Sequence, residues 1–149
     1  MKDLVDTSMI YSCVCANVRR TDLVVSQFYD GVLAPSGLYA LQFGLLSAIA
    51  KLAPITINRL AEVMDMDRAT INRHLKMLTD EDWIRYEEGE ERGTSQVLLT
   101  QEGEQVLGCA RPLWQEAQDR IEHAFGHERF TVLLGELAAI RTALSSGAA

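Results

Sequence analysis

The sequence predicts a mostly α-helical protein with a small β-hairpin wing. Three features of residues 56–100 carry this prediction. Two short amphipathic segments are joined by very few residues, two extended segments flank a polar loop bracketed by glycines, and a threonine then begins another helix. This order predicts a winged helix-turn-helix, with the helices before and after it left to pack elsewhere.

The first helix of the pair is predicted over residues 57–64. Its apolar residues recur at i, i+3, i+4 and i+7: Ile57, Leu60, Ala61 and Met64. Thr56 is the expected N-cap, because a hydroxyl oxygen can accept a hydrogen bond from a free amide of the first turn.

A second helix is predicted to follow a tight turn, with Asp67 as its N-cap. Its apolar residues share one face: Ile71, Leu75 and Leu78. The opposite face carries long or hydrogen-bonding side chains: Arg68, Thr70, Asn72, Arg73 and Lys76. Such a face suits a helix in the major groove of DNA, where arginine reads guanine and asparagine reads adenine. The alternative is a polar helix face that is merely solvated.

A hairpin is predicted after the second helix. Apolar character restarts at Trp83 and Ile84, Gly89 and Gly93 bracket a polar tip, and residues 96–99 return as a second strand. A loop of this length between two strands is typical of a wing. Thr100 is then the expected N-cap of a further helix.

At this point the chain resembles the MarR (multiple antibiotic resistance regulator) family over nearly all of its length. The segments that carry the resemblance are DRATINRHLKML, DEDWIRY, EERGTSQVLLT and LTQEG. The resemblance implies a DNA-binding transcriptional regulator, a repressor released by a small ligand or an oxidant. It matches Arg68 and Arg73 to recognition-helix arginines, Thr70 and Asn72 to neighbouring base- or phosphate-facing positions, and Arg92 to a wing arginine that enters the minor groove. The expected DNA-binding set also includes Thr56 and Lys76.

The wing departs from the family pattern. Gly93 stands where a second wing arginine is usual, and Asp82 stands where a glycine is usual. Residues 80–91 carry seven acids against Arg85 alone: Asp80, Glu81, Asp82, Glu87, Glu88, Glu90 and Glu91. Acids beside a DNA surface weaken non-specific binding, which depends on neutralising phosphates. The acidic wing therefore favours the main alternative, a winged helix that binds proteins and not DNA.

Long helices are predicted on both sides of this module. A first helix runs from about Ile10 to Leu33, and a second begins at Leu38. Residues 101–125 form a long helix bent at Pro112, and a final helix follows Gly126. These helices hold more apolar surface than the small module can cover, which predicts a homodimer on a pseudo-palindromic site in double-stranded DNA. We expect a single domain over residues 1–149, with a DNA-binding region at 38–100 and dimerisation regions at 1–34 and 101–149.

Composition predicts one globular domain, and the lack of a signal-peptide pattern or a segment of transmembrane length predicts that it is located in the cytoplasm. The chain has 149 residues, is 48% hydrophobic and carries a net charge of −7, which does not by itself suggest a nucleic-acid binder. We expect no membrane segment, no cofactor and no metal, since the cysteines and histidines lie in no ligand-like spacing. An enzyme is not expected either, because no phosphate loop or catalytic triad spacing occurs.

The cysteines and tyrosines of the first helices suggest a sensing site. Cys15 precedes Tyr29 by 14 residues on one helix face, and Tyr39 lies beyond. This arrangement resembles the branch of the family that senses organic hydroperoxides, although a thiol on an apolar helix face is more often a core residue. The family's ligand cleft, between the dimerisation helices and the DNA-binding module, implies that Arg19, Tyr39 and Phe43 lie near an effector.

Overall fold

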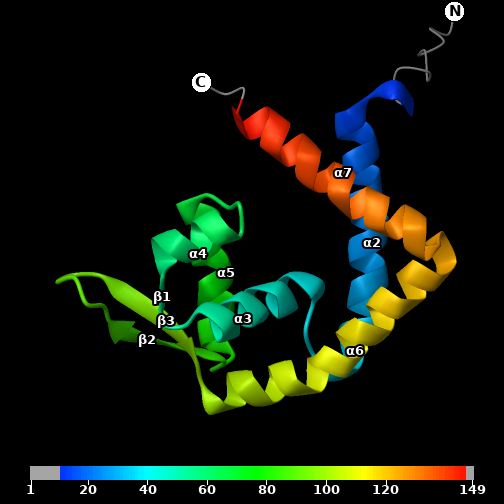
Figure 1. Ribbon diagram of the computed structural model, residues 1–149. Helices are drawn as coiled ribbons and strands as arrows, with labels where there is room; N and C mark the ends of the chain where they lie inside the picture. Colours follow the sequence, from blue (N-terminus) through cyan, green and yellow to red (C-terminus); the bar gives the residue numbers. More distant parts are fainter. Residues whose placement is uncertain (1–10, 147–149) are drawn as a thin grey trace, which may run out of the picture.

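The computed structural model describes residues 11–146, which are mostly helical, with a small sheet at one end of the molecule (Figure 1). Residues 11 and 12 are helical. The other elements, in chain order, are α2 (Val14–Leu33), the 3-10 turn η1 (Ala34–Ser36), α3 (Ala40–Leu52), β1 (Ile55–Thr56), α4 (Ile57–Val63), α5 (Arg68–Asp80), β2 (Ile84–Glu88), β3 (Ser95–Leu99), α6 (Gln101–Phe125) and α7 (His127–Ser146). The predicted fold class, mostly helical with a β-hairpin wing, is confirmed.

Three predicted helix starts are confirmed by their caps. The Thr56 hydroxyl accepts from the Arg59 amide at 3.2 Å, and the Asp67 carboxylate accepts from the Thr70 amide at 2.8 Å. The Thr100 hydroxyl accepts from the amide three residues on at 3.0 Å. Each bond satisfies a donor that the first turn of a helix leaves unpaired.

The sheet contains one strand more than the sequence predicted. The hairpin strands β2 and β3 pair antiparallel, and β1 pairs with the other edge of β3, which gives the order β1-β3-β2. Val97 of β3 lies opposite Ile55 on one side and Tyr86 on the other. The short strand β1 therefore ties the start of α4 to the wing.

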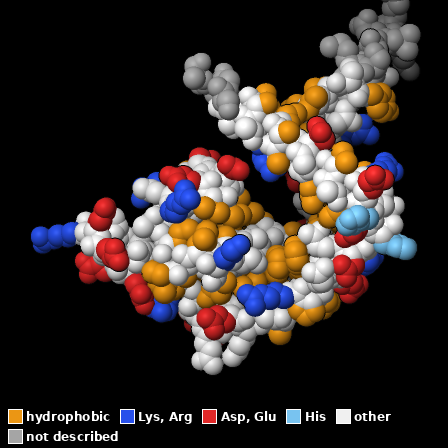
Figure 2. Space-filling model, in the orientation of Figure 1, with side chains coloured by type: hydrophobic (Ala, Val, Ile, Leu, Met, Phe, Trp, Pro, Cys, Tyr) orange, Lys and Arg blue, Asp and Glu red, His pale blue; other side chains and the backbone are white. Residues whose placement is uncertain are grey.

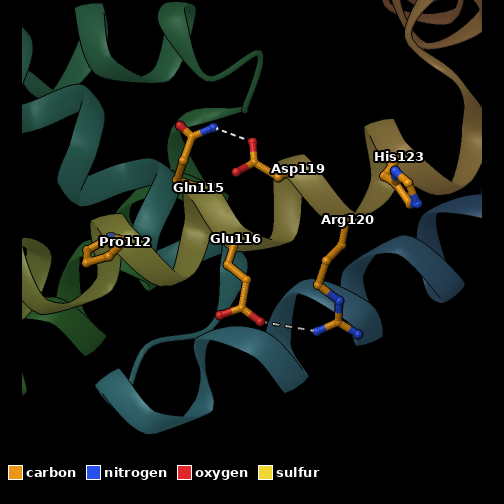
Figure 3. A pocket seen from close by; sticks show the side chains of 6 residues that line it. All are labelled: Pro112, Gln115, Glu116, Asp119, Arg120 and His123. Atoms are coloured by element: carbon orange, nitrogen blue, oxygen red, sulfur yellow. Dashed lines mark hydrogen bonds and ion pairs between the residues drawn. The ribbon is translucent and has the colours of Figure 1, made fainter.

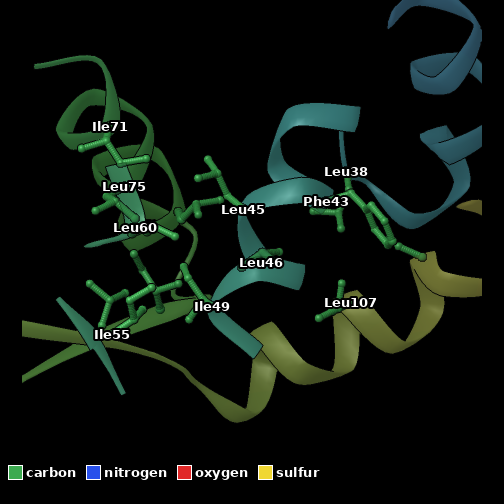
Figure 4. Packing of buried hydrophobic residues seen from close by; sticks show 14 of the residues in the cluster. Leu38, Phe43, Leu45, Leu46, Ile49, Ile55, Leu60, Ile71, Leu75 and Leu107 are labelled. Atoms are coloured by element: carbon green, nitrogen blue, oxygen red, sulfur yellow. The ribbon is translucent and has the colours of Figure 1, made fainter. Parts of the chain in front are cut away.

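One apolar core joins the sheet to α3, α4, α5 and the first half of α6 (Figure 4). Its largest fully buried side chains in this module are Leu38, Leu45, Leu46, Ile49, Leu60, Ile71, Leu75, Leu78, Val97 and Leu107. Because both α4 and α5 bury one face in this core, their outer faces are fixed toward solvent.

The structure corrects the predicted start of α3. The helix begins at Ala40, two residues later than expected. The amide of Ala40 donates to the Asp30 carboxylate at 2.7 Å, and the amide of Tyr39 donates to the Gln42 side chain at 2.9 Å. A side chain from the end of α2 thus caps α3 across the intervening turn.

The predicted first helix is interrupted. Cys13 has an extended backbone, with φ −78° and ψ 117°, between the helical residues 11–12 and α2. The expectation of one helix through this point is therefore wrong, and Ile10 lies outside the described residues. The later helix is continuous from Gln101 to Phe125 with Pro112 inside it, and Gly126 separates it from α7 as predicted.

Among residues 11–146, no single helix is long and apolar enough to cross a membrane. The segments Val14–Ser36 and Ala40–Leu52 have the length and apolar composition of a membrane span only when they are taken together, and this pair is bent by 70°.

Candidate nucleic-acid interface

Helix α5 presents a polar face to solvent because its other face is fully buried. Ile71, Leu75 and Leu78 have no exposed surface. On the opposite side, Arg68, Asn72, Arg73 and Lys76 are exposed and Thr70 is half-buried. The sequence prediction of which side chains share this outer face agrees with their placement.

The exposed side chains of α5 differ in their contacts. The Arg68 guanidinium donates to the Asn58 side chain at 2.9 Å, and Lys76 forms an ion pair with Asp80 at 2.8 Å. The side chains of Asn72 and Arg73 form no hydrogen bond or ion pair with another residue of the range 11–146. Their side chains therefore keep their full hydrogen-bonding capacity toward solvent.

The N-terminus of α5 is held by a compact cap. The Asp67 carboxylate accepts from both the amide and the hydroxyl of Thr70, each at 2.8 Å. These two bonds lower the pKa of the Asp67 carboxyl below its usual value. The hydroxyls of Thr56 and Thr70 thus both take part in helix caps, and both residues are half-buried.

The tip of the wing is a tight loop that carries Arg92 outward. The Gly89 amide donates to the Thr94 carbonyl at 2.8 Å, and the Thr94 amide and hydroxyl donate to the Glu91 carbonyl at 3.0 and 2.6 Å. Gly93 has φ +84°, a left-handed conformation that favours glycine. This backbone explains why glycine stands here in place of the arginine usual in the family.

Asp82 is the other departure from the family pattern that the backbone explains. It has φ +62°, at the turn between α5 and β2. Aspartate tolerates the left-handed region better than most residues, so it can stand where the family usually has glycine.

The acids of the wing remain at the surface. All seven are exposed, and two are paired: Asp80 with Lys76 and Glu87 with Arg85. Figure 2 shows acidic side chains gathered on the wing, with a basic side chain reaching out beyond its tip. Arg92 is exposed and makes no hydrogen bond or ion pair with a described residue. A nucleic acid that approached the tip of the wing would therefore meet the unpaired Arg92 guanidinium and the unpaired carboxylates of the wing together.

The residues expected near an effector do not form one cluster in the single chain. Tyr29 donates its hydroxyl to Gln118 at 2.7 Å, and Phe43 stacks on Trp114 with 5.7 Å between ring centroids, so both pack against α6. Burial raises the pKa of Tyr29. Tyr39 is exposed at the start of α3.

Cys15 and Arg19 lie in the first half of α2. Both are exposed. Fourteen residues of continuous helix separate Cys15 from Tyr29, a rise of about 21 Å. Within one chain, Tyr29 therefore cannot contact the Cys15 thiol.

Open crevices lie along α6. One, of about 680 Å³, is lined by residues of α6 that include Pro112, Gln115 and His123 (Figure 3). A neighbouring crevice of about 510 Å³ lies between α2 and α6, where the Arg120 guanidinium sits 4.9 Å from the Phe28 ring centroid. Neither crevice is lined by the predicted effector residues.

Asn58 is a residue of this surface that the sequence analysis did not select. It is the second residue of α4, and its side chain reaches the first residue of α5. The available signal was its polar side chain at an exposed position in the first turn of α4.

The amino-acid sequence is similar to one family model and to one curated protein. Residues 36–93 match the model of the MarR family. The uncharacterized HTH-type transcriptional regulator YwoH of Bacillus subtilis (strain 168) is 26% identical over 118 residues, which cover 74% of this chain and 86% of YwoH.

Solved structures share the whole fold. The M. tuberculosis transcriptional regulator MosR, in complex with DNA, superposes with a TM-score of 0.83 at 27% identity, over 93% of this chain and 100% of that one. The transcriptional repressor CouR, bound to a 23-mer DNA duplex, superposes with a TM-score of 0.82 at 20% identity, over 92% and 98% of the two chains. CouR bound to p-coumaroyl-CoA gives a TM-score of 0.81 over 92% of this chain and 97% of that one.

Proposed function

We propose that the chain is a member of the MarR family and a sequence-specific DNA-binding transcriptional regulator. We propose further that it is a repressor, that it acts as a homodimer on a pseudo-palindromic operator, and that a small ligand or an oxidant releases it. Such a protein works where chromosomal DNA lies, so the proposed location is the cytoplasm.

The polar face of α5 is the observation that carries this proposal. Helix α5, here called the recognition helix, is held by three fully buried side chains and turns Arg68, Asn72 and Arg73 outward. Arginine and asparagine are the side chains that form paired hydrogen bonds to guanine and adenine in the major groove. MosR, at 27% identity, has been crystallised with DNA in the same fold.

The exposed apolar surface of α2 and α7 supports the homodimer. Large apolar side chains on these helices are at least one-third exposed: Val14, Val18, Leu23, Val24, Val25, Val132, Leu133, Leu134, Leu137 and Leu144. Figure 2 shows hydrophobic side chains on the surface of this arm, away from the wing. Extensive exposed apolar surface is typical of interfaces, and a two-fold dimer would present two recognition helices to one face of a duplex.

An effector would act through α6, which leads from the wing to the helices α2 and α7. The proposed ligand cleft contains Arg19, Tyr39 and Phe43. A ligand that entered between α3 and α6 would displace the Phe43–Trp114 stack and shift α6 relative to α3 and the rest of the DNA-binding module. Since both recognition helices must match the groove spacing at once, a small change in their separation favours release. The oxidant route runs through Cys15, with Tyr29 and Tyr39 as the associated tyrosines.

Duplex binding by the purified chain tests the proposed function. Random-sequence duplexes are selected on the chain, and the enriched duplexes are titrated by fluorescence anisotropy, with light scattering to count the chains per duplex. The expected result is enrichment of a two-fold symmetric sequence bound by two chains. A folded chain that enriches no sequence would overturn the proposal.

The acidic wing favours one other function, a winged helix that binds proteins. Seven exposed acids lie within residues 80–91, and such a charge opposes phosphate binding. The same selection separates the two functions. A module that binds only proteins should enrich no duplex sequence, even though it exposes Arg68, Arg73 and Arg92.

A further inference from the structure

We propose that Asn58 is a positioning residue for Arg68 and thereby sets base preference at the start of the recognition helix. This inference rests on the proposed DNA-binding function. It assigns a role to a residue of α4, the helix that precedes the recognition helix in the chain.

The turn between the helices fixes the distance that this contact spans. The Met66 amide donates to the Ala61 carbonyl at 2.9 Å, and Asp65 has a left-handed backbone with φ +51°. These features bring the first turn of α4 beside the first residue of the recognition helix. Arg68 Nη1 then donates to Asn58 Oδ1 at 2.9 Å.

A neutral acceptor suits a reading arginine. The guanidinium has five N–H donors, and the bond to Asn58 orients the group while leaving the other donors and the full positive charge available. An acidic partner at the same place would neutralise that charge. Asp65 and Asp67 flank Arg68 closely in the sequence, yet neither forms an ion pair with it in the structure of residues 11–146.

The Asp67 cap contributes to this selectivity. Both oxygens of the Asp67 carboxylate are taken by Thr70, one by its amide and one by its hydroxyl. The carboxylate is therefore held away from the guanidinium, and Asn58 is the side chain that Arg68 contacts. An arginine held in one rotamer loses less side-chain entropy when it binds a base than a freely moving one.

A purely structural role for this bond is disfavoured by its surroundings. Asn58 and Arg68 are both exposed, whereas α4 and the recognition helix are held together by fully buried residues such as Leu60 and Ile71. Exposed hydrogen bonds add little to the free energy of unfolding when water can replace them. Loss of Asn58 should therefore leave the fold intact.

The test compares Asn58→Ala and Asn58→Asp in the full chain, using duplexes that the wild-type chain selects from a random pool. Asn58→Ala should weaken binding about three- to tenfold and relax preference at the base pairs that Arg68→Ala also relaxes. In the Arg68→Ala background, Asn58→Ala should have no further effect. Asn58→Asp should keep Arg68 ordered but weaken binding, because it neutralises the charge. Gln115→Ala, which removes an exposed amide bonded to Asp119 at 2.8 Å on α6, is the matched control.

A readout without DNA separates this inference from the proposed function. The order parameter of the Arg68 Nε–H group, measured by NMR in the free chain, should fall in Asn58→Ala and not in Gln115→Ala. An unchanged order parameter would overturn the positioning role, even if DNA affinity falls. Equal losses from Asn58→Ala with and without Arg68 would also overturn it, since Asn58 would then act on DNA directly. If the wild-type chain selects no duplex, the proposed function fails, while the order parameter still decides whether Asn58 orients Arg68.

Discussion

Gly103 of α6 lies directly against the carbonyl group of Trp83, the residue that precedes β2. A Cβ atom added at Gly103 would lie 2.0 Å from the Trp83 oxygen. The Trp83 carbonyl also accepts a hydrogen bond from the Thr100 amide at 3.0 Å. The Thr100 hydroxyl donates to the carbonyl of Asp82, the residue before Trp83. This close approach joins the entry of the wing to the start of α6.

Gly103→Ala should therefore destabilise the chain by about 1–3 kcal/mol, because the methyl group meets backbone that cannot turn aside. Gly108→Ala is the matched control, since a Cβ there meets nothing within 4 Å and the residue is exposed on the same helix. That substitution should stabilise the chain by about 0.5–1 kcal/mol. Chemical unfolding measures both, and equal effects would show that the Trp83 contact relaxes easily.

The Asp67 cap predicts a pH dependence. Hydrogen bonds from the Thr70 amide and hydroxyl lower the folded-state pKa of Asp67. Because this value lies below the unfolded-state pKa, the ionised carboxylate stabilises the fold above the unfolded-state value, and the contribution is lost as the pH falls through the folded-state value.

Asp67→Asn keeps a capping oxygen but cannot ionise, so it isolates this effect. The wild-type chain should have the higher Tm at neutral pH, and the difference should shrink as the pH falls from about 5 toward 2. Differential scanning calorimetry across this range measures it. A difference that does not change with pH would show that the charge of Asp67 does not matter to the cap.

Local signals explain why most of the fold could be predicted from the sequence. The caps at Thr56, Asp67 and Thr100 close within three residues along the chain, so each is visible as a residue type at one position. The polar face of α5 was predictable because helical periodicity fixes it once the buried face is known.

Features that depend on distant residues were not predictable in the same way. Strand β1 exists because Ile55 pairs with Val97, far along the chain, and α3 starts at Ala40 because Asp30 caps it. The Asn58–Arg68 bond requires the exact course of a tight turn, which sequence periodicity does not specify. The interruption at Cys13 has no proline or glycine to signal it.

Arg73 should contribute directly to base reading. Its side chain is exposed on the recognition helix and contacts no other described residue by hydrogen bond or ion pair. Arg73→Ala should cost about 1–3 kcal/mol in affinity for a selected duplex and relax sequence preference. Arg111→Ala on α6 removes the same charge elsewhere and serves as control. Anisotropy titrations give both values, and equal, small losses would remove Arg73 from the base contacts.

Arg92 should act as a minor-groove contact from the wing. Arg92→Ala should weaken binding while the dimer stays intact. It should also reduce the slope of log affinity against log salt concentration by about one, the amount expected for one lost phosphate contact. Arg92→Lys keeps the charge but not the guanidinium, so it should restore the salt dependence more than the affinity. Titrations at several salt concentrations separate these effects. Full affinity in Arg92→Ala would mean that the acidic wing is not a DNA element.

Cys15 provides the test of oxidant release. The thiol is exposed on α2 in the single chain, and Tyr29 lies too far along the same helix to contact it, so any activation by Tyr29 would have to come from a second copy. In the reaction, the thiolate attacks the peroxide oxygen, the O–O bond breaks, an alcohol leaves, and Cys15 becomes a sulfenic acid. A second thiol can then displace water to form a disulfide.

Organic hydroperoxide should therefore release the chain from a selected duplex, and thiol reductant should restore binding. Cys15→Ser should abolish the effect, with Cys13→Ser and Cys109→Ser as controls because both thiols are also exposed. Loss of the effect in one control as well would identify the thiol that forms the disulfide. Mass spectrometry and anisotropy on the same sample connect modification to release. If Cys15 stays unmodified, or is modified while the chain remains on DNA, oxidation is not the signal, and a reversibly bound small ligand is the better account of release.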